Sequence, residues 1–352
     1  MERASFGKLV DNGSTENIGD RLLPVIATRL SGGLGNNLFG YAISRLAAER
    51  AGGEFCYFPP RSTTSAHRFR NLMNRVRGGI KSLVVPRSAQ EPSGHPLQTR
   101  HPKQTAKADL ADYFELSPIP GPWGRRGLQR RWERKMPPHA VEVNSSPGYD
   151  GQWAELEDWT EIQPPTTFAG LEAHRRTVCE WYTPRPNYQK LLDEVEQQIP
   201  VPPEKRCCLH IRRGDFLWHD KGYAYQDQGW ALPWEYYQHV LKLLPEGLHY
   251  LVVTDDPEYA REKLASVKCK TIIEGNPDPV DLFSFTLCKY NVVANSTFSM
   301  WGAWLNDTPD KEVWAPEFNL GWHKREWMPA PLGWSPPEWR FVDVLGLMET
   351  EV

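Results

Sequence analysis

The spacing of apolar residues predicts that strands and helices alternate along most of the chain. Residues 25–30 (Val-Ile-Ala-Thr-Arg-Leu) are typical of a short buried strand, and residues 38–46 place apolar side chains at the spacing of one helix face. A glycine-rich loop joins the two segments. Strand, glycine loop and helix in that order indicate the opening unit of an α/β domain.

A second region of the same kind begins after residue 200. An amphipathic helix over 186–199 ends at Pro200, Pro202 and Pro203, and we place the boundary between two domains there. The expected strands beyond it cover 207–211, 249–254, 270–273, 291–294 and 311–314, and the expected helices cover 234–244, 258–264, 280–288 and 298–305. Strands that alternate with helices indicate a parallel sheet with right-handed crossovers.

These patterns divide the chain of 352 residues into four parts, a length that fits two domains or slightly more. The parts are a flexible tail (1–22), an N-terminal α/β domain (23–200), a C-terminal α/β domain (201–315) and a Trp- and Pro-rich wrap (316–352). Within the first domain, 59–150 is Pro-rich and irregular. Its basic run, 125–135, is either a solvated helix face or a patch that steers an anionic ligand.

Composition narrows the class of protein only slightly. The formal net charge of −3 disfavours nucleic acid or an anionic membrane as a partner. The 15 tryptophans either fill the core or stack on sugar rings. No apolar stretch reaches the length of a signal peptide or a membrane span, so we expect a cytoplasmic protein, with a truncated form of a membrane-anchored parent as the alternative.

The six cysteines show no metal-binding spacing. We expect free thiols in a reducing compartment rather than a disulfide framework. Cys207 and Cys208 are neighbours on a predicted strand, so their side chains should point to opposite faces of the sheet.

An arginine pair follows the strand 207–211, at the sheet edge where ligands of α/β proteins bind. Arg212 and Arg213 carry planar guanidinium groups that suit a diphosphate, and Gly214 allows close backbone approach. The alternative is an ion pair with Asp215 that caps the sheet. The arginine pair is therefore the leading candidate for an anion site.

Other strand ends deliver polar groups to the same edge. The segment 295–299 (Asn-Ser-Thr-Phe-Ser) either forms an anion site at a helix start or simply caps that helix. Asp255 and Asp256 fit a helix cap, a divalent metal site, or acceptors for the N–H groups of a purine. The loop 31–37 lacks the Gly-x-Gly-x-x-Gly spacing of a dinucleotide site, but its glycines still permit close approach to a ligand.

Taken together, the segments 32–42, 210–216, 254–256 and 281–306 resemble the α-1,2-fucosyltransferases of glycosyltransferase family eleven. The resemblance spans residues 25–315 in order, and the last segment is long and specific. The family usually has Gln where this chain has Asn37, often Gln where it has Gly40, and commonly Trp where it has Met300. The first two departures lie in the loop expected to face the transfer site, so they bear on acceptor choice.

The resemblance implies a GT-B-like α/β fold, with two Rossmann-type domains facing a cleft and the donor bound mainly by the C-terminal one. It implies inverting, metal-independent transfer of L-fucose from GDP-fucose to the 2-hydroxyl of a terminal β-galactoside, with no cofactor besides the donor. The implied site residues are Arg212, Arg213 and Asp215 for catalysis, and Gly33, Gly35, Asn36, Asn37, His210, Arg212, Asp255, Asp256, Asn295, Ser296, Thr297, Phe298 and Ser299 for donor binding.

Several alternatives stay open at this point. Asp215 is either the general base or a group that orients an arginine. The chain could be a fucosyltransferase of another linkage, O-fucosyl or α-1,6, although these lack the long segment at 288–306. A non-catalytic carbohydrate-binding protein is a second alternative, and a nicotinamide oxidoreductase a distant third. Calorimetry with GDP separates the second from an enzyme, because a lectin should ignore GDP.

Overall fold

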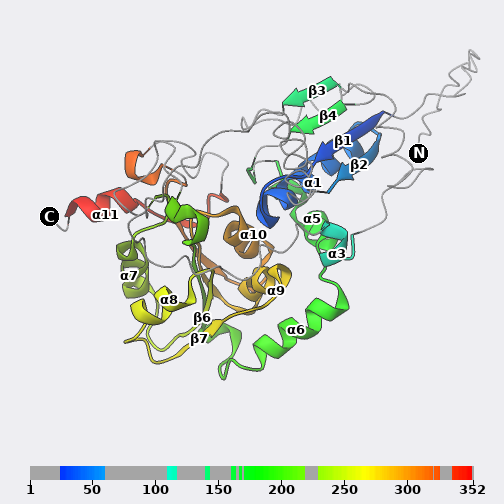
Figure 1. Ribbon diagram of the computed structural model, residues 1–352. Coiled ribbons are helices and arrows are strands. Elements are labelled where there is room, and N and C mark those ends of the chain that lie inside the picture. Colours follow the sequence, from blue (N-terminus) through cyan, green and yellow to red (C-terminus); the bar gives the residue numbers. More distant parts are fainter. Residues whose placement is uncertain are drawn as a thin grey trace, which may run out of the picture.

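A computed structural model describes two α/β units, each built on a parallel sheet (Figure 1). The described residues are 24–59, 109–116, 139–142, 160–163, 166–168, 170–218, 229–319, 321–325 and 335–350. The predictions for the tail 1–22, the basic run 125–135 and most of the Pro-rich region 59–150 lie outside these residues.

The first sheet has four strands in the order β2-β1-β4-β3, and every pair is parallel. Its strands are β1 (Val25–Arg29), β2 (Glu54–Phe58), β3 (His139–Glu142) and β4 (Thr160–Gln163). Helix α1 (Leu34–Arg50) follows β1 and packs on it and on β2. The predicted opening unit of strand, glycine loop and helix is confirmed.

The second sheet has six parallel strands in the order β10-β9-β8-β5-β6-β7. Its strands are β5 (Arg206–Ile211), β6 (His249–Thr254), β7 (Lys270–Ile273), β8 (Tyr290–Val292), β9 (Glu312–Pro316) and β10 (Arg340–Val342). The α-helices between and after them are α7 (Trp234–Leu243), α8 (Pro257–Lys263), α9 (Asp278–Phe283), α10 (Thr297–Leu305) and α11 (Val344–Thr350), and the 3-10 helices are η5 (Gly214–Trp218), η6 (Ser284–Leu287) and η7 (Trp322–Lys324).

Shorter elements connect the two sheets. They are α3 (Leu110–Tyr113), η3 (Glu172–His174), α5 (Arg175–Trp181), α6 (Pro186–Glu196) and η4 (Pro203–Lys205). Helix α6, which we assigned to the first domain, packs against α9 of the second unit (Figure 1). The chain therefore joins the second unit somewhat before residue 201.

Both sheets contain a point at which the chain reverses its direction of growth. From β5 the chain adds β6 and β7 on one side and then returns to place β8 on the other. Around β1, strand β2 lies on one side and β4 on the other. Such switch points leave a crevice at the carboxyl ends of the strands, where ligands of doubly wound sheets bind.

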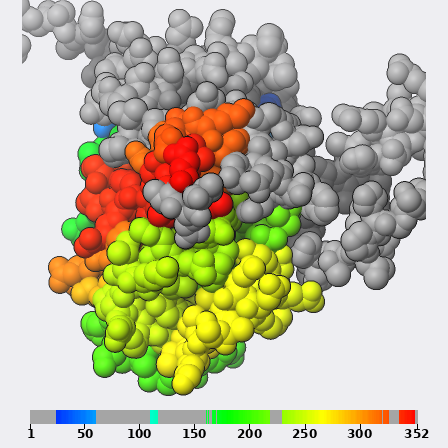
Figure 2. Space-filling view, turned by 90° about the vertical axis from the view of Figure 1, so that its left-hand side faces the viewer, coloured from blue at the N-terminus to red at the C-terminus, as the bar shows by residue number. Residues whose placement is uncertain are grey.

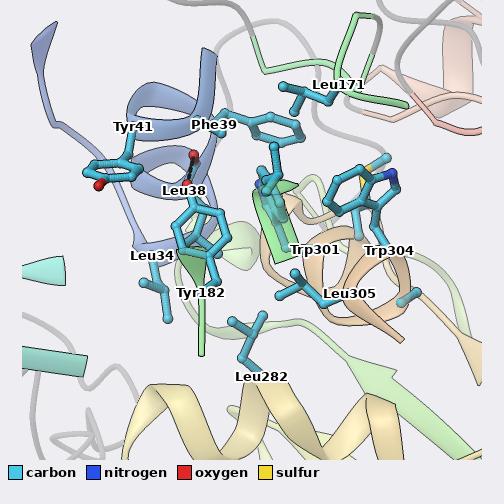
Figure 3. Packing of buried hydrophobic residues seen from close by; sticks show 14 of the residues in the cluster. Leu34, Leu38, Phe39, Tyr41, Leu171, Tyr182, Leu282, Trp301, Trp304 and Leu305 are labelled. Atoms are coloured by element: carbon cyan, nitrogen blue, oxygen red, sulfur yellow. Dashed lines mark hydrogen bonds between the residues drawn. The ribbon is translucent and has the colours of Figure 1, made fainter. Parts of the chain in front are cut away.

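An aromatic core joins the two units (Figure 3). Phe39 of α1 lies 4.8 Å from Trp301 of α10 between ring centroids, and Tyr182 lies 5.4 Å from the same indole. The Tyr182 hydroxyl donates a hydrogen bond of 2.6 Å to the carbonyl of Leu38. Because these rings are buried together, α1 and α10 are held against each other, and the GT-B-like arrangement of two facing units is confirmed.

The C-terminal segment completes the second sheet. Strand β10 pairs with β9, and α11 packs against α7 and η7 (Figure 2). The described part of the predicted wrap thus adds an edge strand and a helix to the second unit. None of the described helices is long and apolar enough to cross a membrane.

The buried cysteines behave as the strand pattern predicts. Cys207 packs in one core cluster and Cys208 in the other, so they face opposite sides of β5. All six cysteines lie among the described residues, and none forms a disulfide.

Candidate active site

A cavity of about 610 Å³ lies where the two switch points face each other. The segments after β1 and β4 line it from the first unit, and the segments after β5, β6, β7, β8 and β9 line it from the second. Eleven of the predicted site residues line the cavity: Gly33, Gly35, Asn36, His210, Arg212, Asp215, Asp255, Asn295, Ser296, Thr297 and Phe298. Polar residues that follow parallel strands are expected to meet at the carboxyl edge of the sheet, which we call the strand-end rule. Segments that are distant in sequence meet at one cavity in this way.

Arg212 stands at the centre of this edge, directly after β5. Two carboxylates orient it: Asp215 accepts a hydrogen bond from Nη2, and Asp255 lies 2.8 Å from Nη1. Its guanidinium also lies over the ring of Phe216, 5.2 Å from the centroid. The Nε atom is buried and has no partner among the described residues. Arg212 is thus rigidly held but keeps one donor for a ligand.

Arg213 points away from the cavity. Its Nε donates to Asp256 at 3.1 Å, and its guanidinium lies 3.6 Å from the ring centroid of Tyr259. Asp256 also accepts from the backbone N–H of Tyr259, which caps α8. Arg213 and Asp256 therefore lie behind the lining, because they stabilise the start of α8 rather than facing a ligand.

Asp255 connects the arginine loop to the neighbouring strand. One of its oxygens accepts from the backbone N–H of Arg213 at 2.8 Å, and the other pairs with Arg212. A Cβ on Gly214 would lie 2.3 Å from this second oxygen, so the glycine gives Asp255 room to reach the arginine. The ion-pair reading and the ligand reading of the arginine loop are thus compatible.

The first unit touches the second at the mouth of the cavity. A Cβ on Gly35 would lie 2.5 Å from the backbone of Thr297, so only glycine allows α1 and α10 to approach this closely. Beside it, the Thr297 hydroxyl donates to Asn36 at 2.8 Å. Ser296 holds the N-cap position of α10, yet its hydroxyl makes no capping hydrogen bond. The helix start therefore contributes more than a simple cap.

Two further predicted residues lie off the lining. Asn37 is buried within α1. The Ser299 hydroxyl is buried and donates to the carbonyls of Ala294 and Ser296. Both positions belong to the first turns of helices that begin at the cavity, which explains why motif position alone placed them in the site.

His210 lines the cavity from the end of β5 and is buried. Burial and the nearby Arg212 charge lower the pKa of its imidazole to about 3, so the ring is neutral at physiological pH. Its Nδ1 has no partner among the described residues, and its ring lies 5.7 Å from that of Phe298. A neutral imidazole beside an aromatic ring suits a flat heterocyclic ligand.

Sequence reasoning missed two acidic residues that line the cavity. Asp278 and Asp281 line the cavity from α9, which follows β7. Burial raises the pKa of both carboxyls, to about 7 for Asp281, where a hydrogen bond from Asn276 acts in the opposite direction. One oxygen of Asp281 is buried and has no partner among the described residues. The strand-end rule would have found them if it had been applied after β7.

Other lining residues are absent from the set of implied site residues. They are Gly32, Leu34, Thr166, Phe216, Trp230, Val253, Thr254 and Asn319. Thr166 follows β4 and Asn319 follows β9, so both obey the same topological rule. The strand before Thr166 was not predicted from the sequence, whereas the strand before Asn319 was predicted at 311–314.

The arrangement combines a fixed guanidinium, the N-terminus of α10 and a glycine loop. Guanidinium groups and helix N-termini both favour phosphate oxygens. The cavity also has aromatic and hydroxyl-bearing walls. Chemically it suits a phosphorylated ligand with a ring at each end.

Comparison with known proteins agrees with this description. Residues 185–320 match the sequence profile described as Glycosyl transferase family 11. The O-antigen biosynthesis glycosyltransferase WbnK of Escherichia coli is 32% identical over 154 residues, which are 42% of this chain and 50% of that protein. An alpha-1,2-colitosyltransferase of Escherichia coli is 29% identical over 172 residues, 46% of this chain and 56% of that protein.

The match thus spans about half the length of these relatives. Among solved structures, the fucosyltransferase NodZ from Bradyrhizobium superimposes over 81% of this chain and 93% of that one, with 11% identity and a TM-score of 0.48. The profile match contains the arginine loop, Asp255, Asp281 and the start of α10. Residues 185–320, which are less than half of the chain, are therefore similar to glycosyl transferase family 11.

Proposed function

We propose that this protein transfers L-fucose from GDP-fucose to the 2-hydroxyl of a terminal β-galactoside, forming an α-1,2 linkage with inversion. The observation that carries the proposal is Arg212, which lines the cavity at the switch point of the second sheet, is held by two carboxylates and has a buried Nε without a partner among the described residues. The similarity of residues 185–320 to glycosyl transferase family 11 supports a sugar transferase, and the paired arginine and helix N-terminus support a diphosphate donor.

In this proposal the nucleotide lies on the side of Arg212 where Asp278 and Asp281 line the cavity. The rings of His210 and Phe298 provide aromatic contacts for the base, and the unpartnered oxygen of Asp281 accepts an N–H group of guanine. We first expected Asp255 or Asp256 to perform this role. The oxygens of both residues already accept from arginine or backbone groups, so Asp281 is the better candidate.

Transfer proceeds by a single displacement. The acceptor oxygen forms a bond to the anomeric carbon while the bond from that carbon to the β-phosphate oxygen breaks. The bonding electron pair leaves with GDP, and the hydroxyl proton passes to water or a cavity carboxylate. Arg212 stabilises the negative charge where it develops, because it is already oriented before the reaction. Asp215 acts as a positioning residue, since it accepts from Arg212 Nη2.

The experiment that tests the proposal is a transfer assay in the presence of EDTA. Purified protein is incubated with GDP-fucose and a panel of galactosides that includes lactose, and products are read by mass and linkage analysis. We expect α-1,2-fucosylated product without added metal. Product of another linkage would replace the linkage assignment, and no binding of GDP by calorimetry would overturn the donor.

The relative named as an alpha-1,2-colitosyltransferase suggests a second donor sugar. Colitose differs from fucose by the absence of one ring hydroxyl, so the same site geometry could accept either. A parallel assay with the colitose donor measures which sugar gives the higher kcat/KM. A clear preference for colitose would keep the nucleotide site and change the donor sugar.

A further inference from the structure

The polar groups that line the cavity differ on the two sides of Arg212. On the side of β6 and β7 they are carboxylates: Asp255, Asp278 and Asp281. On the side of β8 and β9 there is no carboxylate in the lining, and the polar groups are the carboxamides of Asn295 and Asn319 and the hydroxyls of Ser296 and Thr297. Each asparagine follows its strand by three residues. A nucleotide sugar carries a base and a sugar at opposite ends of its diphosphate, and the cavity has two chemically distinct ends to match.

Both carboxamides are buried with an unused acceptor. Asn295 is 2% exposed and Asn319 is 4% exposed. The Oδ1 atom of each is buried and has no hydrogen-bond partner within the part of the chain that the structure describes. A buried acceptor without a partner is costly unless a ligand supplies the donor.

The orientation of Asn295 is fixed by a neighbour. Its Nδ2 donates at 2.8 Å to the carbonyl of Trp230. Because a carbonyl can only accept, the nitrogen must face Trp230, and the oxygen is therefore the atom left for a ligand. The same carbonyl lies 3.4 Å from Trp322 Nε1, which helps to hold this segment in place.

An aromatic wall accompanies the two acceptors. The indole of Trp230 is partly exposed and lines the cavity together with Phe216, whose ring centroid lies 5.9 Å away in an edge-on arrangement. Trp and Phe rings pack on the apolar faces of pyranoses, while hydroxyl groups at the ring edge donate to acceptors such as carboxamide oxygens.

We propose that Asn295, Asn319 and Trp230, here called the amide corner, bind a pyranose ring by accepting hydrogen bonds from its hydroxyl groups. The inference rests on the proposed function, because it assumes that Arg212 holds a sugar diphosphate between the two ends of the cavity. The pyranose is either the fucosyl group of the donor or the galactoside acceptor, and both present the same hydroxyl chemistry.

The test compares Asn319→Ala with the wild type in stability, GDP binding and transfer. Removing an unpartnered acceptor should leave the Tm unchanged or raise it. GDP affinity by calorimetry should stay within about twofold, whereas kcat/KM should fall about five- to tenfold, the loss expected for one hydrogen bond to substrate. Trp230→Phe should act in the same direction through lost ring area.

Two measurements identify which sugar occupies the corner. If it binds the donor sugar, Asn319→Ala lowers the ratio of GDP-fucose affinity to GDP affinity, measured as Kd for GDP divided by Kd for GDP-fucose. If it binds the acceptor, that ratio is unchanged and the KM for lactose rises. Either outcome supports the inference.

Asn291→Ala is the matched control. Asn291 is fully buried on β8, and its side chain donates to the carbonyls of Phe285 and Tyr290 and accepts from Asn306. Its loss should lower the Tm with little effect on kcat/KM per folded molecule. A fall in Tm for Asn319→Ala with unchanged kinetics would show the same structural role and overturn the amide corner.

Two further outcomes keep this inference separate from the proposed function. A wild type that binds no GDP overturns the proposed function and with it the basis of the corner. A wild type that transfers fucose, with Asn319→Ala matching it in every constant, overturns only the corner. Loss of GDP affinity in Asn319→Ala would also overturn it, because the residue would then contact the nucleotide.

Discussion

The loops after β1 and β5 occupy equivalent places in two sheets but differ sharply in chemistry. Each follows the strand from which its sheet grows in both directions, and each faces the same cavity. The segment after β1, residues 30–36 with the first turn of α1, carries no charge, whereas the segment after β5 carries two arginines and an aspartate. Topology thus decides where the two loops meet, and side chains decide what each one does there.

The arginine loop needs neighbours that the glycine loop does not. Arg212 and Arg213 are balanced by Asp215, Asp255 and Asp256, two of which come from the end of β6. A cation at a partly buried site is tolerated when paired and hydrogen-bonded in this way. The glycine loop instead relies on close backbone contact with α10. One loop therefore depends on electrostatics and the other on steric fit.

The largest expected effect on activity comes from removing Arg212 from the loop after β5. Arg212→Ala should lower kcat/KM for fucose transfer by about a thousandfold or more, because the charge on the departing diphosphate loses its fixed partner. The fold should persist, since Arg212 lies at the sheet edge and its side chain is only partly buried. Initial rates with GDP-fucose and lactose, together with circular dichroism, measure both.

Arg340→Ala is the control for removing an arginine from this sheet. Arg340 pairs with Glu312 at 3.0 Å, lies over Trp314 and does not line the cavity. The Arg340→Ala variant should transfer fucose at the wild-type rate. Near-wild-type turnover of Arg212→Ala would contradict the diphosphate role and leave Arg212 as a structural ion pair.

Gly35→Ala tests the close contact between the start of α1 and the start of α10, and Gly33→Ala is its matched control. Alanine usually stabilises a helix relative to glycine, but a Cβ at Gly35 would lie 2.5 Å from the backbone of Thr297. We expect a loss of about 1–3 kcal/mol in the free energy of unfolding, as in other overpacked sites. A Cβ at Gly33 would meet nothing within 4 Å, so the Tm of Gly33→Ala should stay close to that of the wild type.

Urea denaturation of the two variants distinguishes fit from ligand contact. If Gly33→Ala retains the wild-type stability but loses transfer activity, its backbone contacts the substrate. Equal stability of the two variants would mean that α1 and α10 can separate without cost, which is inconsistent with the buried rings of Phe39 and Trp301 at their interface.

Much of this comparison is visible in the sequence, and the reason is local. Strand, loop and helix signals are encoded within short windows, so the alternation after residue 200 and the strand-end positions of Arg212 and Ser296 follow from pattern alone. What the pattern cannot supply is which partner each side chain meets. Asp255 turns toward Arg212 and Asp256 toward Arg213, although the two carboxylates are adjacent in sequence.

The missed residues share a physical cause. Asp281 lies inside a helix, with no turn or glycine to mark it, and its burial depends on how α9 packs. Asn319 lies three residues after β9, in a segment with no helix or turn signal to mark it, and it reaches the cavity only through the packing of that segment. Residues whose role depends on long-range packing are thus those that periodicity fails to reveal.

Asp281→Asn should have the smallest effect on activity. It tests the buried carboxylate that lines the cavity on the side of β6 and β7. Burial raises the pKa of Asp281 from its usual value near 3.8 to about 7. The folded protein therefore binds a proton that the unfolded chain releases between about pH 4 and pH 7, so wild-type stability falls as pH rises through this window. Above pH 7 the ionised, buried carboxylate destabilises the fold by up to about 4 kcal/mol.

The asparagine variant removes this pH dependence. It should match the wild type near pH 4 and exceed it in free energy of unfolding at pH 8, measured by urea denaturation at both values. Its affinity for GDP should fall about tenfold, because a charged acceptor for the base is lost. Higher stability with weaker GDP binding is expected of a carboxylate kept for its ligand. Unchanged GDP affinity would return the base contact to Asp255 and make Asp281 a buried group without a role in binding.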